Sequence, residues 1–212
     1  MGIVERKEKQ KLEIRKLILD ASMKLFVEEG FEHVSIRKIA DLIEYSPTTI
    51  YLYFKDKDEI YLDLHDIGFA NMQELNRNLE GIRNPLLRLH KMGENYLNFG
   101  VDNPEYYDLM FIQRAPMRRL NEMPCSDWKS GDAAMLGLKN TVRECMEQGF
   151  LAKSDVDLVS ITIWSTVHGL VSLVIRGRME KFVADPEQIR PVLMQSLNFF
   201  INTLDISGKA GK

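Results

Sequence analysis

Cysteine, proline and glycine are scarce in this chain. Its 212 residues include only two cysteines, seven prolines and 13 glycines. Cys125 and Cys145 make neither a metal-ligand spacing nor a disulfide framework, so a reducing compartment, the cytoplasm, is the expected location. Because so few residues break helices, long helices are expected and a strand-rich fold is not.

The chain also lacks the side-chain groupings that metal sites and active sites need. No two of its four histidines stand four residues apart, and neither cysteine joins them in a ligand spacing. No nucleophile and base stand in an arrangement typical of covalent catalysis. We therefore predict no metal, no cofactor and no enzymatic activity.

Positive charge is not in excess, because the formal net charge is −3. This value excludes a uniformly basic nucleic-acid coat protein, although DNA binding depends on where charges lie rather than on their sum. Residues 1–16 hold six Lys or Arg against three Glu. The segment fits either a solvated arm or a contact with phosphates.

Long uncharged runs are almost absent. The one run to consider, Leu158–Ile175, has 18 residues without a charged side chain, and seven of them are Ser, Thr, Gly or His. A membrane-spanning helix needs about 20 mostly apolar residues. We therefore expect a buried helix of a soluble protein and no membrane contact.

Apolar side chains recur at helical spacing along the chain, and no segment shows convincing strand-like alternation. Ser or Asn followed by Pro, at Ser46-Pro47 and Asn84-Pro85 for example, is typical of helix starts. We predict an all-α fold of about nine helices, with a loop over residues 116–131. The predicted helices cover residues 8–29, 35–43, 47–53, 56–70, 85–99, 104–115, 132–148, 155–178 and 186–205.

The second and third of these helices indicate a helix-turn-helix, with the first helix packed beside them. Small Ala40 allows a close approach, Ile50 fills the space between the two helices, and Glu44 and Tyr45 make the turn. The third helix would enter the major groove, with Leu52 and Phe54 facing inward.

Uncharged polar side chains on the predicted reading helix suit base edges, while hydroxyls and lysines beside it suit phosphates. The expected DNA-binding residues are Ser35, Arg37, Tyr45, Ser46, Thr48, Thr49, Tyr51, Tyr53 and Lys55.

The segment FVEEGFEHVSIRKIADLIEYSPTTIYLYFKDKDEI, residues 26–60, resembles the DNA-binding domain of TetR/AcrR regulators. The resemblance implies a homodimeric, all-helical repressor with a DNA-binding domain over 1–55 and a ligand-binding and dimerisation domain over 56–212. Glu44 departs from the family's usual turn glycine, which adopts a left-handed backbone without strain. Tyr45 replaces a smaller apolar residue and could itself reach DNA.

The C-terminal part carries a shorter match. WSTVHGLVSL, residues 164–173, resembles a Trp-x-x-x-His-Gly segment of one subgroup of these regulators. Aromatic and methionine side chains on the middle helices would line an effector cavity. The expected ligand-binding residues are Tyr96, Phe99, Tyr107, Met110, Phe111, Arg114, Trp128, Met135, Trp164 and His168.

The helix over 155–178 is apolar almost all round, so a second copy of the chain is its expected cover. Expected dimer contacts are Gly169, Ser172, Ile175, Leu193, Leu197 and Phe200. We therefore predict three partners: a palindromic DNA operator, a small apolar or aromatic effector, and a second copy. Two alternatives stay open, a DNA-binding regulator with no small ligand and an all-helical enzyme with a vestigial DNA-binding domain.

Overall fold

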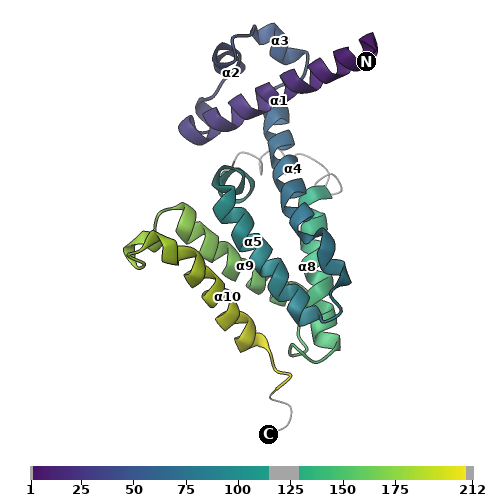
Figure 1. Cartoon of the computed structure of the whole chain (residues 1–212), viewed down its shortest axis with the longest axis vertical. Helices are drawn as coiled ribbons and strands as arrows, with labels where there is room; N and C mark the ends of the chain where they lie inside the picture. The colour runs from purple at the N-terminus through teal and green to yellow at the C-terminus, as the bar shows by residue number, and fades with distance from the viewer. Residues whose placement is uncertain (1, 115–128, 209–212) are drawn as a thin grey trace. The chain divides into compact units, whose positions relative to one another are not determined.

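The computed structural model describes residues 2–114 and 129–208 of the chain (Figure 1). These residues form helices joined by turns and contain no strand, which confirms the all-α prediction. The α-helices are α1 (Ile3–Glu29), α2 (Ile36–Leu42), α3 (Pro47–Tyr51), α4 (Lys57–Asn76), α5 (Pro85–Asp102), α6 (Pro104–Tyr107), α8 (Lys129–Glu147), α9 (Val156–Ile175) and α10 (Ile189–Leu204).

Most predicted helices are present, but several ends differ. Helix α1 begins at Ile3 instead of residue 8, and α3 ends at Tyr51 instead of residue 53. The helix predicted over 104–115 is four residues of α6 followed by a π-helical turn, Asp108–Ile112. A 3-10 turn, Pro186–Gln188, precedes α10.

The chain divides into two compact units. The first unit comprises Met1–Gly68 and Glu105–Asp127, and the second comprises Phe69–Pro104 and Trp128–Lys212. The first unit therefore takes in the start of α4 and the π-helical turn, beyond the 1–55 segment that we assign to DNA binding.

The core of the first unit holds the three N-terminal helices together. Ile18 and Phe26 of α1 pack in one cluster with Ile39 of α2, Ile50 of α3 and Tyr61 of α4. Ile50 is completely buried, as is Ala40, so the predicted plug between α2 and α3 is present. Burying such side chains contributes about 1.5–3 kcal/mol each, so α3 is stabilised by this core rather than by its own five residues.

Helix α5 is the centre of the second unit and packs against α8, α9 and α10. Its buried Leu97 and Phe99 meet a core to which α8 adds Val142 and α9 adds Val171. A Cβ at Gly93 would stand 2.7 Å from Leu197 Cδ1, so the glycine permits the close approach of α5 and α10.

Helix α9 is the one described helix that is long and apolar enough to cross a membrane. Only 22% of its most apolar stretch is buried inside a single chain. The expectation of a buried helix is thus met in part: Ile163, Val167 and Val171 face the core, whereas Leu158 and Ile161 are exposed.

Candidate nucleic-acid interface and effector site

Helix α3 starts at a complete N-terminal cap. Ser46 has an extended backbone, its hydroxyl accepts a hydrogen bond from the Thr49 N–H at 3.1 Å, and Pro47 occupies the first turn. The Ser46 Oγ also lies 2.9 Å from Thr49 Oγ1. Ser46 and Thr49 are therefore engaged with each other in the cap, which fixes where the short helix begins.

The outer side of α3 presents uncharged side chains. Thr48 is exposed, and 57% of Tyr51 is exposed. Leu52, which we expected to pack inward, is 75% exposed, so that prediction is wrong. The reason is angular: Leu52 lies two residues after buried Ile50, and two helical residues turn about 200°. Phe54, four residues after Ile50, is buried as predicted.

The turn between α2 and α3 closes in a Schellman arrangement. The Tyr45 N–H donates to the Ala40 carbonyl at 3.0 Å, and the Glu44 N–H donates to the Asp41 carbonyl at 3.3 Å. Glu44 has φ 59° and is the one described non-glycine residue with positive φ. Glu44 thus takes the left-handed conformation itself, and Tyr45 stays exposed next to α3.

The other predicted DNA-binding residues are divided between structural and exposed positions. Ser35 caps α2 by accepting from the Lys38 N–H at 3.2 Å, whereas Arg37 is exposed. Tyr53 is half-buried against the core of the first unit. Lys55 is exposed directly after α3.

Two nearby cations belong to the fold. The Lys57 ammonium donates to the carbonyls of Phe31 and Val34 at 2.8 and 3.2 Å. The Arg15 guanidinium pairs with Asp63 of α4 and lies 4.9 Å from the centre of the Phe54 ring. Arg15 therefore joins α1 to the residues that directly follow α3.

Three predicted effector residues form a hydrogen-bonded cluster in the second unit. The Trp164 indole N–H donates to the Tyr96 hydroxyl at 3.0 Å, and this hydroxyl lies 3.4 Å from His168 Nδ1. Burial lowers the pKa of His168, which favours its neutral form. A neutral His168 can accept at Nδ1 from Tyr96, so the cluster places three ring side chains from α5 and α9 together.

The remaining predicted effector residues are distributed over both units. In the second unit, Phe99 is buried on α5 and Met135 is half-buried on α8. In the first unit, the rings of Tyr107 and Phe111 are in tilted contact with their centres 4.9 Å apart, Met110 lies against Gly68, and Arg114 is exposed. Trp128 lies outside the described residues.

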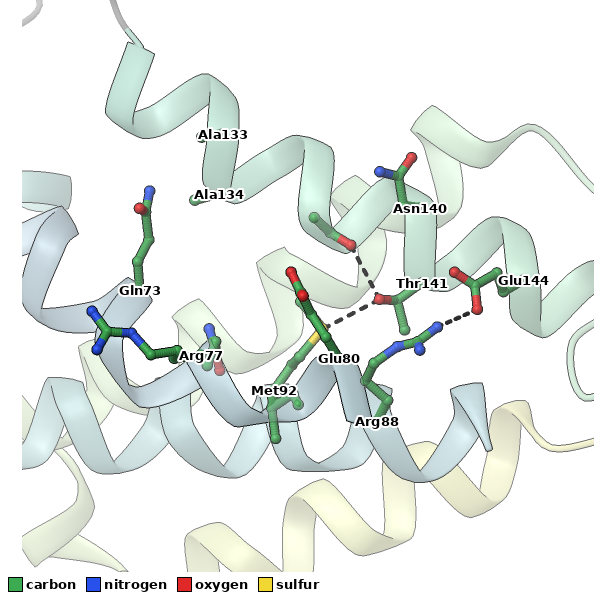
Figure 2. A pocket seen from close by; sticks show the side chains of 13 residues that line it. Gln73, Arg77, Glu80, Arg88, Met92, Ala133, Ala134, Asn140, Thr141 and Glu144 are labelled. Carbon is green, nitrogen blue, oxygen red and sulfur yellow. Dashed lines mark hydrogen bonds and ion pairs between the residues drawn. The ribbon is translucent and has the colours of Figure 1, made fainter. Parts of the chain in front are cut away.

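A pocket of about 510 Å³ opens in the second unit between the end of α4, the following 3-10 turn (Arg77–Gly81), α5 and α8 (Figure 2). Most of its lining residues are polar or charged, and Arg88 pairs with Glu144. Small side chains on α8, Ala133, Ala134 and Gly137, leave the space open. Sequence analysis missed this pocket; the signal was that run of small residues on a helix face opposite long polar side chains.

The predicted dimer residues do not share one environment. Gly169 borders open space, and Ser172, Ile175 and Phe200 are partly exposed. Leu193 and Leu197 are 0% and 1% exposed, so they pack inside their own unit and are unsuited to a contact with a second copy. The exposed apolar side chains that sequence analysis left out are Leu158, Ile161, Leu173 and Phe199.

Metal-ligating side chains are not grouped in the described part of the chain: no three His, Cys, Asp or Glu residues there could hold an ion together. The geometry instead offers a short, capped, uncharged helix on a small helical core and a larger helical unit with a polar pocket.

Comparison with known proteins places this arrangement in a family. Residues 18–64 match the model of bacterial regulatory proteins of the tetR family, and residues 89–197, more than half of the chain, match the model of the tetracyclin repressor-like C-terminal domain. The fold and the sequence together therefore define a helix-turn-helix regulator. The chain belongs to the TetR family of transcriptional regulators and is not an enzyme.

Two characterised relatives are similar over different lengths. The chain is 40% identical over 157 residues to the HTH-type transcriptional regulator HbdR of Aromatoleum sp. (strain CIB), covering 74% of this chain and 68% of that protein. It is 34% identical over 71 residues to the HTH-type transcriptional regulator AcrR of Shigella flexneri, covering 33% of each.

Solved structures share the fold at low sequence identity. The ketosteroid transcriptional regulator KstR2 of Mycobacterium tuberculosis has a TM-score of 0.69 at 19% identity, covering 90% of this chain and 94% of that one. The TetR family regulator PfmR of Thermus thermophilus has a TM-score of 0.66 at 20% identity, covering 87% and 93%.

Proposed function

We propose that the chain is a cytoplasmic repressor that binds a palindromic operator as a homodimer and is released by a small, largely apolar or aromatic effector. The observation that carries the DNA-binding part is the outer side of α3, where Thr48, Tyr51 and Leu52 are exposed on a helix anchored by buried Ile50. Hydroxyls can bond base edges or phosphates, and an apolar side chain can contact a thymine methyl group.

The remaining contacts follow from position. Tyr45 and Lys55 are exposed at the two ends of α3, where they would reach phosphates, and Arg37 would do so from α2. Ser35, Ser46, Thr49 and Tyr53 are proposed to act mainly by holding the helices in place, since each is a cap or is partly buried.

Dimerisation is proposed through the exposed side of α9 and α10. Leu158 and Ile161 are 62% and 53% exposed, and Phe199 is 76% exposed. A soluble chain that leaves such an apolar helix uncovered gains stability by burying it against a second copy. Two copies can then set their α3 helices about 34–36 Å apart, one turn of B-DNA.

Effector recognition is proposed at the cluster of Tyr96, Trp164 and His168. Ring side chains suit an aromatic or apolar ligand, and the Tyr96 hydroxyl and His168 can bond a polar group on it. Release would require the effector to favour a conformation that separates the two α3 helices differently, because a ligand shifts an equilibrium only through its differential affinity.

Selection of bound duplexes from a random DNA pool tests the operator. Tyr51→Ala and Lys55→Ala should weaken binding to all sequences, whereas Thr48→Ala should relax preference at one base pair by about 1–3 kcal/mol. Lys153→Ala, an exposed lysine of the second unit, is the control. Equal losses on every duplex from the Thr48, Tyr51 and Lys55 variants would contradict this division, and recovery of no duplex would contradict DNA binding.

A second candidate is a regulator without a small ligand. It is favoured by the burial of Phe99 and Tyr107, two of the side chains expected to line the effector cavity. Thermal unfolding with a panel of apolar and cationic compounds separates the two, since a ligand that binds only the native state raises stability. Stabilisation that Tyr96→Phe and Trp164→Phe abolish supports the effector site, and no stabilisation by any compound supports the alternative.

A further inference from the structure

Helix α1 continues well beyond the core that it helps to form. Ile14 is its first residue packed against the hydrophobic cluster, yet the helix begins at Ile3, so about three turns extend past the core (Figure 1). This extension carries four basic side chains, Arg6, Lys7, Lys9 and Lys11, and Arg15 and Lys16 follow directly after Ile14.

The basic side chains of the extension are not equivalent. Lys7, Lys11 and Arg15 follow each other at four-residue spacing, so they lie along one side of α1. Ile14 and Ile18 point to the same side, because they are seven residues from Lys7 and Lys11. Lys7 and Lys11 therefore continue the side of α1 that packs toward α2 and α3.

Contacts of Arg15 show which part of the first unit lies next to the line of Lys7, Lys11 and Arg15. Its guanidinium stands over the ring of Phe54, the residue directly before Lys55 at the end of α3. Lys11 and Lys7 lie one and two turns further out, and Lys7 is roughly 12 Å from Arg15 along the helix axis, at about 1.5 Å per residue. The row thus leads away from the edge of the proposed DNA-binding surface.

The two outer cations are available for a partner. Among the described residues, neither Lys7 nor Lys11 has an acidic group within ion-pair distance, and both are exposed. On the other side of the helix, Lys9 pairs with Glu13 at 3.9 Å. Two like charges one turn apart weaken an isolated helix, and an anionic partner would reverse that effect.

We propose that Lys7 and Lys11 form a phosphate-binding row that contacts the DNA backbone just outside each operator half-site. The inference rests on the proposed DNA-binding function and adds a flanking contact to it. The roughly 12 Å from Arg15 to Lys7 along α1 corresponds to three or four base pairs, at about 3.4 Å per pair. Phosphate contacts by lysine carry no base preference, so the row adds affinity and register but not sequence specificity.

The test compares two double variants that remove the same charge from the same helix. Lys7→Ala/Lys11→Ala removes the row, and Lys9→Ala/Lys16→Ala removes two cations from the opposite side. Alanine is a strong helix former, so both variants should keep α1, which circular dichroism checks. Binding to a selected operator is measured by fluorescence anisotropy over a range of salt concentrations.

Each lost phosphate contact lowers the slope of log K against log salt by about 0.9, so a dimer lacking the row should lose about 3.6. Between about 50 and 200 mM salt, the wild type should then lose roughly a hundredfold more affinity than the row variant. The control variant should keep the wild-type slope. Trimming about four base pairs from each operator end should weaken the wild type to the level of the row variant and leave that variant unchanged.

The outcomes separate the two hypotheses. Equal slopes for the two double variants, or a row variant that still responds to trimming, would overturn the proposed row while DNA binding stands. A wild-type chain that binds no duplex at low salt would overturn the proposed function itself.

Discussion

Replacing Glu44 by glycine should stabilise the DNA-binding unit. Glu44 occupies the residue after the α2 cap with φ 59°, and both hydrogen bonds of the Schellman turn run around it. These bonds come from backbone groups of Glu44 and Tyr45, so a glycine can make the same turn. The substitution changes the backbone preference and removes one exposed carboxylate.

The expected gain is the difference between two backbone effects. A left-handed backbone costs a non-glycine residue about 1–2 kcal/mol, while glycine loses about 0.5–1 kcal/mol more conformational freedom on folding than other residues. The net stabilisation is then about 0.5–1 kcal/mol. For a chain of this size, that corresponds to a rise in Tm of about 1–4 °C.

Urea unfolding of wild type, Glu44→Gly and Glu44→Ala measures the effect. Alanine removes the same carboxylate but keeps the left-handed strain, so it should show no such gain. Both variants lose one negative charge beside α3, and both should bind DNA more tightly by a similar factor. The reasoning is refuted if Glu44→Gly unfolds at the same urea concentration as Glu44→Ala.

Two further predictions concern α4. Gly68→Ala would place a Cβ 3.0 Å from Met110 Cγ and 3.1 Å from Tyr106 Cδ1, so we expect a loss of about 1–2 kcal/mol by overpacking. In the second unit, a Cβ at Gly137 of α8 meets nothing within 4 Å, so Gly137→Ala should raise the free energy of unfolding by up to about 1 kcal/mol, measured by urea unfolding. A change in stability of the same sign for both variants would contradict this prediction. Burial lowers the pKa of His65, against an opposing effect of Asp66, so the folded state holds it neutral. The contribution of His65 to stability should be complete above the histidine pKa of the unfolded chain, about 6.5, and should be lost as the pH falls below it. His65→Gln should flatten this loss of stability, whereas His33→Gln, at an exposed histidine, should not. The reverse result would exclude His65 as the cause.

Local signals in the sequence determined much of the first unit. Ser35 and Ser46 cap α2 and α3 as their positions before helical patterns indicate, and buried Ile50 follows from helical spacing. The prediction for Leu52 is wrong because it places Leu52 and Phe54 together on the packing side, although helical spacing sets Leu52 opposite Ile50.

Other features depend on contacts between distant residues, which spacing does not reveal. The π-helical turn after α6 lies where the Tyr61 hydroxyl donates to the Leu109 carbonyl at 2.8 Å, across 48 positions of sequence. Helix α10 has apolar residues on more than one side, and only its packing on α5 shows that Leu193 and Leu197 face inward while Phe199 faces out. The polar pocket likewise depends on how α4, α5 and α8 meet.

Capping and DNA reading compete for the same atoms on α3. The Ser46 hydroxyl already accepts from the Thr49 N–H and lies against the Thr49 hydroxyl, so a base or phosphate could use it only by displacing a cap that contributes about 1 kcal/mol. Thr48 takes no part in the cap, and neither do the exposed side chains of Tyr51 and Leu52. The base preference of the operator should therefore be set by Thr48, Tyr51 and Leu52, while Ser46 and Thr49 determine how firmly the reading helix is held.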